Sequence, residues 1–537
     1  MPSAPSVQEF AKSLGLKDPS LLHNQSLIGG KWVDAKSGRR FIVEDPSTGK
    51  LLCDAPEMDV EDADEAIAVA LKAFDSFRKT THRARARMLR KLNDLMIENR
   101  EDIAKVIIAE NGKPLWQSQE LINVWRHTTA CNLSFRDPSP FILPLTPQVA
   151  EGLAEVDYAA TFIEWFSGEA ERTYGATIPA SNPANRIITI KQPIGVVAAL
   201  CPWNLPIAMA TRKVGAAIAA GCTTVVKPAG ETPYSTLMLG ELVSRAGIPD
   251  GVVNVLSSLE TTPRLGEKFC VDPRVKKISL TGSTRVGKLL VKQSADTLKK
   301  LSLELGGNAP VIVYEDADLE KAAKGILVSK LRNGGQTCVS ANRILVHRNI
   351  ADALVKVMAG MIGSMVVGGG SDPKANIGPL ISSRAVDKVK HHVEDAISGG
   401  AKVVWQYPSP LTGPQFSKGY FYPPTIVTGV NQSMQVWGEE TFGPLAAITL
   451  FDSEQEAVKL ANESKVGLGA YVFTKDMSKA MRTAEEIQTG MVGINTGMLS
   501  ASESPFGGVN ESGYGKEGSF MGIEEYLITK AITMDVS

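Results

Sequence analysis

Apolar residues recur at helical spacing in two stretches near the start of the chain, residues 59–76 and 82–99. Glu61 and Asp62 favour the start of the first helix because acidic side chains stabilise the positive end of a helix dipole. Asp59 is a candidate N-cap for the same helix. The pattern therefore predicts two consecutive amphipathic helices.

Two short runs rich in β-branched residues follow, at residues 194–200 and 223–226. Between them lies a helical stretch from about residue 207 to 219, with Gly221 just past its end, where glycine commonly ends a helix. A strand, a helix and a second strand in this order predict a β-α-β unit.

Further β-rich runs alternate with amphipathic stretches along the rest of the chain. They lie at residues 252–256, 277–280, 344–346, 445–451, 470–473 and 491–495. Alternation of strands and helices is typical of parallel α/β sheets. We therefore expect an α/β protein with two α/β domains, and the segment from Glu304 to Gly307 near their boundary.

Composition narrows the function classes. The chain has 537 residues, 43% hydrophobic and 21% charged, with a net charge of −1, which is ordinary for a soluble enzyme of more than one domain. Nothing indicates a polyanion or membrane partner. The six cysteines form no CxxC pair and no metal-binding spacing, so we expect a reducing compartment and no metal. The N-terminus lacks an apolar signal core, and we expect the cytosol.

The pairing of Cys338 with Glu304 carries the chemistry. Buried cysteines usually only fill space, but the residues before Cys338 are Asn333, Gly334, Gly335 and Gln336, a polar, glycine-rich approach typical of an exposed loop. A thiol that attacks a carbonyl needs a separate base to activate water afterwards. The two residues together indicate covalent chemistry on an aldehyde.

A nucleotide site has to be sought in the loops, because the chain contains no strand–GxGxxG–helix fingerprint. Gly282 and Ser283 lie between a predicted strand and a helix, where free backbone N–H groups bind phosphate. Lys227 ends a predicted strand and can hold an adenosine ribose or its phosphate. Each signal is weak alone, since ordinary α/β connections and solvated strand ends carry the same residue types.

Taken together, these residues resemble the aldehyde dehydrogenase superfamily from about Ile28 to Ile532. The motifs that carry the resemblance are Pro202-Trp203-Asn204-Leu205-Pro206, Lys227-Pro228, Thr281-Gly282-Ser283, Glu304-Leu305-Gly306-Gly307, Gly335-Gln336-Thr337-Cys338, Glu439-Glu440-Thr441-Phe442-Gly443-Pro444 and Pro505-Phe506-Gly507-Gly508. The resemblance implies a Rossmann-type nicotinamide-binding domain, an α/β catalytic domain and a small bridging β element that builds homodimers or homotetramers.

The implied domain order follows the chain. Residues 1–167 are expected to form the first part of the cofactor-binding domain, 168–192 bridging strands, 193–306 the rest of the cofactor-binding domain, 307–502 the catalytic domain and 503–537 a C-terminal bridging segment. Relatives lack a stretch of roughly 30 residues found here at about 117–152. Four prolines in it exclude a continuous helix. We expect a surface excursion or a gene-model artefact, with a subunit contact as the alternative.

The resemblance also assigns catalytic roles. Cys338 is the nucleophile, Asn204 and the Cys338 backbone N–H hold the oxyanion, and Glu304 activates the hydrolytic water. The implied cofactor is NAD or NADP, held by Lys227, Gly230, Gly282, Ser283, Glu440, Phe442 and Trp203. Taken singly, Asn204 also fits a turn between prolines and Glu440 a solvated loop carboxylate.

Within the superfamily the chain most resembles succinate-semialdehyde dehydrogenases, which implies a role in 4-aminobutyrate degradation. The substrate-carboxylate residues of that branch fall on Arg212, Arg332 and Ser500. Without the resemblance, either arginine is an ordinary helix-surface charge. The alternatives are a glutarate-semialdehyde or broad-range aldehyde dehydrogenase, a cofactor-free thiol hydrolase, and a catalytically silent oligomeric binding protein on the same fold.

Cofactor choice depends on one position. NAD-preferring relatives commonly carry a glutamate that repels a 2′-phosphate where this chain has Gly230, and Glu231 is displaced by one residue. Losing that carboxylate should admit NADP, with Lys227 as the phosphate partner. We therefore expect use of both cofactors or a preference for NADP.

Overall fold

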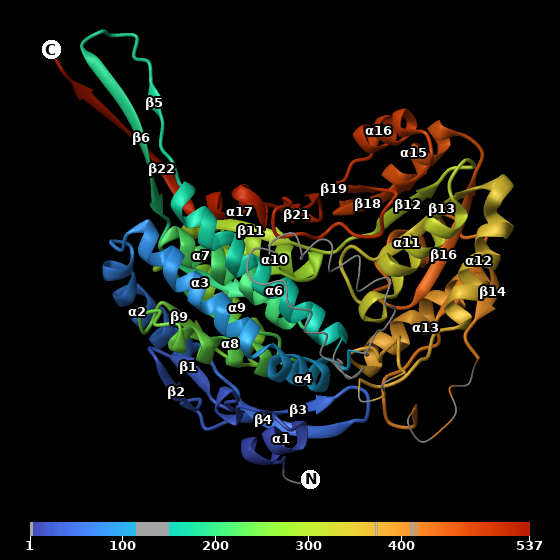
Figure 1. Ribbon diagram of the computed structural model, residues 1–537, viewed down its shortest axis with the longest axis horizontal. Helices are drawn as coiled ribbons and strands as arrows, with labels where there is room; N and C mark the ends of the chain where they lie inside the picture. Colours follow the sequence, from blue (N-terminus) through green and yellow to red (C-terminus); the bar gives the residue numbers. More distant parts are fainter. Residues whose placement is uncertain are drawn as a thin grey trace, which may run out of the picture.

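Two parallel-rich sheets, each covered by helices, form the body of the protein in the computed structural model (Figure 1). The structure describes residues 4–113, 150–370, 372, 374–408, 411, 413 and 416–537. The fold class expected from the sequence is confirmed, because both sheets are built from strand–helix–strand repeats. None of the helices in these ranges is long and apolar enough to cross a bilayer.

The first sheet has eight strands, and its central five run parallel. In spatial order the strands are β2 (Lys31–Val33), β1 (Ser26–Ile28), β9 (Val253–Val255), β8 (Thr223–Lys227), β7 (Val196–Leu200), β10 (Val275–Thr281), β11 (Lys300–Glu304) and β21 (Gly513–Tyr514). The predicted β-α-β unit is confirmed as β7, α7 (Pro206–Ala220) and β8. Gly221 ends α7 with φ +91°, a conformation that glycine adopts without strain.

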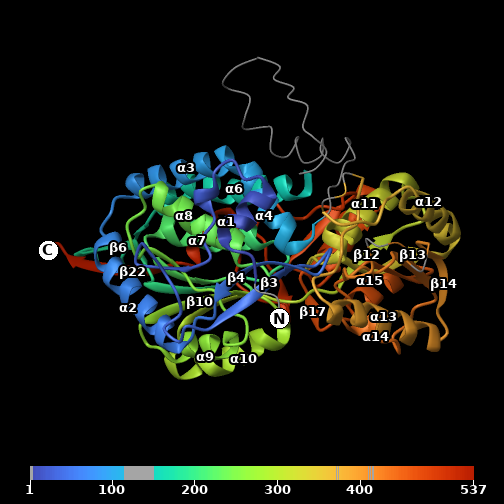
Figure 2. The same ribbon diagram turned by 90° about the horizontal axis from the view of Figure 1, so that it is seen from below.

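Helices cover both faces of this sheet (Figure 2). Alternate residues of β7 point to opposite faces, so Val197 and Ala199 join one core while Val196 and Ala198 join the other. The first core is shared with α3 (His82–Glu98), α4 (Arg100–Asn111), α6 (Ala150–Glu169), α7 and α8 (Tyr234–Arg245). The second is shared with α2 (Val60–Phe77), α9 (Thr262–Val271) and α10 (Thr284–Ser294).

The two predicted early helices are therefore α2 and α3. Asp59 is the N-cap of α2, and Asp62 completes a capping box by accepting a hydrogen bond from the Asp59 backbone N–H at 2.9 Å. The local pattern of charged residues thus marks the helix start correctly.

The second sheet has seven strands and contains the second set of predicted strands. In order they are β14 (Lys402–Gln406), β15 (Thr425–Thr428), β16 (Leu445–Phe451), β13 (Ala341–His347), β12 (Ala309–Val313), β18 (Gly469–Phe473) and β19 (Met491–Ile494). Helices α11 (Leu319–Leu331) and α12 (Ala351–Gly363) pack on one face, and α13 (Ser383–Ser398) and α15 (Glu454–Asn462) pack on the other. Helix α14 (Gln435–Gly438) packs in the same core as α13 and α15, and α16 (Met477–Glu486) contacts β18 and β19.

A ribbon of three strands projects from the body (Figure 1). It consists of β5 (Thr177–Ile178), β6 (Asn185–Pro193) and the C-terminal strand β22 (Leu527–Asp535), and β22 pairs with β6 along its whole length. The remaining elements are α1 (Val7–Leu14), the hairpin β3 (Arg40–Asp45) and β4 (Lys50–Pro56), the pair β17 (Val466–Gly467) and β20 (Val509–Asn510), and α17 (Ser519–Glu524).

The stretch predicted to be an insertion, about residues 117–152, lies mostly outside the described residues. Its last residues, 150–152, lie in the first turn of α6. Glu151 in that turn accepts a hydrogen bond at 2.9 Å from the backbone N–H of Asn333, close to the predicted nucleophile. The bounds of the insertion stay a prediction, and the contact of Glu151 shows that its C-terminal end reaches the turn of Cys338.

Candidate active site

Cys338 lies in a tight turn between the end of α11 and the start of β13. Asn333, Gly334 and Gly335 have φ of +51°, +63° and +82°, so the chain runs through three consecutive left-handed residues. A Cβ at Gly335 would lie 2.3 Å from the carbonyl oxygen of Gly443. The glycine-rich approach seen in the sequence is thus required by close backbone contact, and it presents the thiol.

The predicted oxyanion residue Asn204 lies against this turn. Its Nδ2 donates a hydrogen bond to the Gln336 carbonyl at 3.0 Å, and Asn333 Nδ2 donates to the Asn204 carbonyl at 2.8 Å. The Asn204 side chain is therefore fixed by the residues that lead into Cys338. A fixed amide is suited to holding a developing oxyanion, because it needs no reorganisation during the reaction.

Glu304 lies at the end of β11 in the first sheet and approaches the turn of Cys338 from that side. Gly307 makes the approach possible, since a Cβ there would lie 2.1 Å from the Cys338 carbonyl oxygen. The Glu304 carboxylate is buried, and within the described residues neither oxygen has a hydrogen-bond partner. Burial, with a smaller contribution from the charge of Glu517, raises the pKa of Glu304 to about 8. Such a group can exchange a proton near neutral pH.

The charges of two buried cations on α7, Arg212 and Lys213, lower the pKa of Glu304 and so oppose the effect of burial. Arg212 Nη2 lies 3.7 Å from Glu304 Oε2, and Arg212 Nε lies 2.8 Å from Glu517 Oε2 without the alignment of a hydrogen bond. Lys213 Nζ bonds to Glu517 Oε1 and, at 2.6 Å, to the Thr281 hydroxyl. The guanidinium also lies 4.1 Å from the ring centre of Phe506, a cation–π contact. Glu517 and Lys213 belong to the site although the sequence reasoning missed them.

The thiol of Cys338 is in an unfavourable setting for ionisation. Burial, helped by the charges of Glu304 and Glu440, raises its pKa to about 12, while Arg212 and Arg332 oppose the shift. At neutral pH the thiol is therefore protonated in this structure. A thiolate forms only when a nearby base takes the proton or when local charge changes.

The three predicted substrate-binding residues lie around one phenol. Burial raises the pKa of Tyr158 on α6, while the charges of Arg212 and Arg332 and a side-chain interaction with Ser500 lower it. The charge of Cys338 raises the pKa of Tyr158 further. The structure thus brings Arg212, Arg332 and Ser500 together near the thiol, with Tyr158 among them. Only the phenol was absent from the predicted set.

The predicted nucleotide residues gather at the carboxyl edge of the first sheet, where α/β proteins bind ligands. Lys227 is the last residue of β8, and Gly282 and Ser283 connect β10 to α10. Ser283 caps α10 and is exposed. A Cβ at Gly230 would lie 2.6 Å from Leu259 Cδ1, so a neighbouring loop packs directly on the glycine.

Glu440, Phe442 and Trp203 form the second part of this region. Glu440 Oε1 accepts a hydrogen bond from the Gly307 N–H at 3.1 Å, and burial raises the pKa of Glu440 to about 7. Phe442 has φ +57°, and its ring meets that of Trp203 edge to face at 5.5 Å. Gly306 leaves open the space where Glu440 and the start of α10 meet, since a Cβ there would lie 3.2 Å from both Glu440 Oε2 and Thr284 Oγ1. These residues fit a nicotinamide dinucleotide.

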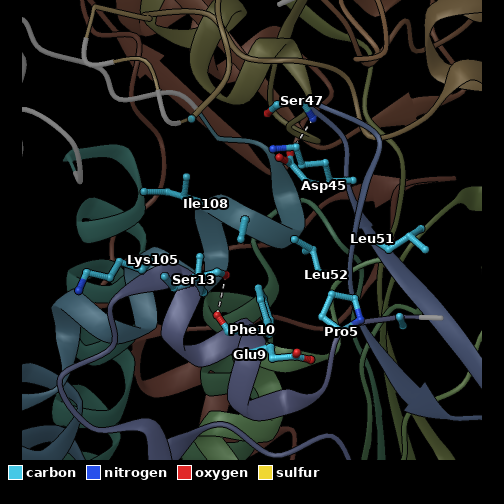
Figure 3. A pocket seen from close by; sticks show the side chains of 15 residues that line it. Pro5, Glu9, Phe10, Ser13, Asp45, Ser47, Leu51, Leu52, Lys105 and Ile108 are labelled. Atoms are coloured by element: carbon cyan, nitrogen blue, oxygen red, sulfur yellow. Dashed lines mark hydrogen bonds between the residues drawn. The ribbon is translucent and has the colours of Figure 1, made fainter. Parts of the chain in front are cut away.

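A separate cavity of about 700 Å³ lies between α1, α4 and the β3–β4 hairpin (Figure 3). Phe10, Ser13, Asp45 and Ile108 are among its lining residues. It contains none of the predicted site residues, and its polar groups are paired locally, as in the Ser13 hydroxyl bond to the Phe10 carbonyl at 2.8 Å. The catalytic cluster lies elsewhere.

A cysteine and a buried glutamate between two α/β sheets, next to residues that fit a dinucleotide, are the groups expected of an oxidoreductase. Comparison with known proteins agrees with this class. The model of the aldehyde dehydrogenase family matches residues 32–133 and 146–532. The chain belongs to the aldehyde dehydrogenase family, as the sequence predicted, and is an enzyme of that family.

Two relatives of nearly equal identity bear different substrate names. A succinate-semialdehyde dehydrogenase [NADP(+)] of Schizosaccharomyces pombe is 46% identical, covering 97% of each chain. A glutarate-semialdehyde dehydrogenase of Pseudomonas putida is 44% identical, covering 97% of this chain and all of its own. The crystal structure of a succinate-semialdehyde dehydrogenase from Burkholderia pseudomallei has a TM-score of 0.88 at 43% identity, covering 97% of this chain and 100% of that one.

Proposed function

We propose that the protein oxidises succinate semialdehyde to succinate with NADP or NAD as the hydride acceptor. The observation that carries this proposal is the gathering of Arg212, Arg332 and Ser500 around Tyr158, next to Cys338. Two guanidinium groups, the buried Arg212 and the half-buried Arg332, suit an aldehyde that carries a carboxylate at its far end, because guanidinium groups bind carboxylates with paired hydrogen bonds.

The chemistry follows from the positions of three side chains. The Cys338 sulfur attacks the aldehyde carbon after losing its proton, and Asn204 Nδ2 with the Cys338 N–H stabilises the oxygen of the thiohemiacetal. When bound, a nicotinamide would supply the hydride acceptor that oxidation of this adduct to a thioester requires. Glu304 then takes a proton from water, the water oxygen attacks the thioester carbon, and the carboxylic acid and the free thiolate of Cys338 are released.

Arg212 has two partners in this scheme. Its guanidinium faces Glu517 at 2.8 Å and Glu304 at 3.7 Å. An incoming carboxylate would therefore compete with Glu517 for the same cation. Arg332 Nη1 lies 3.7 Å from Met498 Sδ. We propose that Arg332 and Ser500 take the larger part in holding the substrate, and that Arg212 also adjusts the charge at Glu304.

The proposed cofactor is NADP, with NAD also accepted. Gly230 carries no carboxylate to repel a 2′-phosphate, and Lys227 supplies a cation at the end of β8. The main rival substrate is glutarate semialdehyde, which is longer by one methylene, a difference worth only about 1–3 kcal/mol in discrimination. A broad-range activity on uncharged aldehydes is the second rival.

The deciding experiment is a steady-state assay of the purified protein with each cofactor. The substrates to compare are succinate semialdehyde, glutarate semialdehyde and butanal, with formation of reduced nicotinamide as the signal. The proposal expects the highest kcat/KM for succinate semialdehyde. A higher kcat/KM for glutarate semialdehyde would move the assignment to the longer substrate, and equal values for butanal would remove the role of a distal carboxylate.

Assembly, compartment and domain division complete the proposal. The projecting ribbon of β5, β6 and β22 exposes most of the β22 side chains, and we propose that it joins copies of the chain into a homodimer or homotetramer. Light scattering of the purified protein measures which of the two forms. We propose that the domain boundaries lie at residues 167, 192, 306 and 502. The proposed compartment is the cytosol.

A further inference from the structure

Glu57 lies just before α2 and is buried, with only 2% of its surface exposed. Its carboxylate accepts hydrogen bonds from the loop that leads into α9. Glu57 Oε1 accepts from the backbone N–H groups of Leu259 at 3.1 Å and Thr261 at 2.8 Å, and from the Thr261 hydroxyl at 2.6 Å. A buried carboxylate is tolerated here because N–H groups at a helix start stabilise negative charge. Glu57 thus ties the 257–261 loop to the body.

The tied loop lies on Gly230. A Cβ at Gly230 would come within 2.9 Å of Leu259 Cα and within 2.6 Å of Leu259 Cδ1. The backbone of Leu259 is therefore in direct contact with the position whose side chain governs cofactor choice. Any change that releases the loop also changes the space beside Gly230.

Glu57 also acts on Lys227 through its charge. The Lys227 side chain is buried, and its burial lowers its pKa to about 8, while the charges of Glu231 and Glu57 oppose this shift. A 2′-phosphate that approaches Lys227 therefore meets two carboxylates as well as the cation. The charge of Glu57 weakens the attraction for a phosphate without touching it.

We propose that Glu57 is a positioning and specificity-determining residue for the dinucleotide. It holds the 257–261 loop against Gly230, and its negative charge reduces the advantage of NADP over NAD. This inference rests on the proposed cofactor site at Lys227. It explains how a chain without a carboxylate at residue 230 can still bind NAD.

Two substitutions separate the anchoring of the 257–261 loop by Glu57 from the electrostatic effect of its charge. Glu57→Gln keeps an oxygen at the Oε1 position, where three of the four hydrogen bonds are accepted, and removes the charge; the fourth runs from the Leu259 N–H to Oε2 at 3.2 Å. Glu57→Ala removes the anchor altogether. Glu260→Gln is a matched control, because Glu260 lies on the same loop but is 73% exposed and paired with Arg39.

The test measures binding of NAD+ and NADP+ by titration calorimetry, together with amide hydrogen exchange. For Glu57→Gln we expect the affinity for NADP+ relative to NAD+ to rise about threefold or more, with no such change in Glu260→Gln. For Glu57→Ala we expect faster exchange at the N–H groups of Leu259 and Thr261 and weaker binding of both dinucleotides.

Two results would overturn the inference. One is a cofactor ratio in Glu57→Gln equal to that of Glu260→Gln. The other is unchanged exchange at Leu259 and Thr261 in Glu57→Ala. Both leave the proposed function intact, provided that the unsubstituted protein binds a dinucleotide. An unsubstituted protein that binds neither NAD+ nor NADP+ would overturn the proposed function and this inference with it.

Discussion

Arg212 Nη2 lies 3.7 Å from Glu304 Oε2, so a residue proposed to meet the substrate faces the residue proposed to activate water. The two come from different parts of the first sheet layer, α7 and the end of β11. Glu517 shares Arg212 with Glu304, since its Oε2 is 2.8 Å from Arg212 Nε. Substrate binding and proton transfer are therefore linked by one guanidinium.

The pH dependence of hydrolysis follows from this arrangement. The raised pKa of Glu304, about 8, means that the carboxylate is mostly protonated at neutral pH and gains its base form as the pH rises. We expect the rate of thioester hydrolysis to increase through about pH 8. Glu517→Gln removes a negative charge that raises the pKa of Glu304. It also removes the second carboxylate that faces Arg212, so the inflection of the hydrolysis rate should move to lower pH. Single-turnover deacylation measured across pH tests this, and an inflection that stays in place or moves upward would contradict it.

The two arginines should differ in their effect on catalysis. Arg332→Ala removes a charged partner of the distal carboxylate and should raise KM for succinate semialdehyde about tenfold or more, with little effect on butanal. Arg212→Ala should raise this KM by a smaller factor and should also lower kcat for both aldehydes, because Glu304 and Glu517 lose the cation between them. The measurement is steady-state kinetics with both aldehydes. Equal changes in KM for the two aldehydes would show that neither arginine binds the distal carboxylate of the substrate.

A carboxylate cannot simply be restored at residue 230. Gly230→Glu places a Cβ within 2.6 Å of Leu259 Cδ1, so the 257–261 loop must move to accept it. We expect weaker binding of both NAD+ and NADP+, with the larger loss for NADP+ because of charge repulsion. Fluorescence titration with the reduced cofactors measures this. Tighter binding of NAD would contradict this prediction, because it would show that the 257–261 loop accommodates the new side chain without weakening the site.

The stretch before α6 offers a test by deletion. Removing residues 117–149 should leave catalysis intact, since no predicted catalytic motif lies inside it. Extending the deletion to residue 152 should lower activity, because it removes Glu151, the acceptor of the Asn333 N–H bond at 2.9 Å. Glu151→Ala in the full chain isolates that contact. Equal activity of the two deletions and of Glu151→Ala would show that the contact does not position the turn of Cys338.

Local pattern was enough to predict part of the elements of the fold, although strands such as β12 and β15 were not among those predicted. The N-cap Asp59 and the glycine after α7 are read directly from sequence, and both are found. The two-sheet architecture followed from alternation of strands and helices.

The candidate site was only partly accessible to sequence reasoning. Arg212 and Lys213 are adjacent cations on a helix that is otherwise apolar, a signal that a buried acid must lie opposite. Sequence spacing could not identify Glu517 as that acid, because it lies about 300 residues away in the chain and is brought close by the fold alone. Glu57 was missed for the same reason, since its partners belong to a loop that no motif marks.

The most direct test of the account is the fate of the thiol in one turnover of Glu304→Gln with succinate semialdehyde and NADP+. We expect a burst of reduced nicotinamide followed by slow turnover, with a succinyl group on the peptide that contains Cys338 by mass spectrometry. Cys338→Ala should give neither the burst nor the modified peptide. A normal rate of turnover in Cys338→Ala, or a burst in Glu304→Gln with Cys338 unmodified, would contradict catalysis through this cysteine.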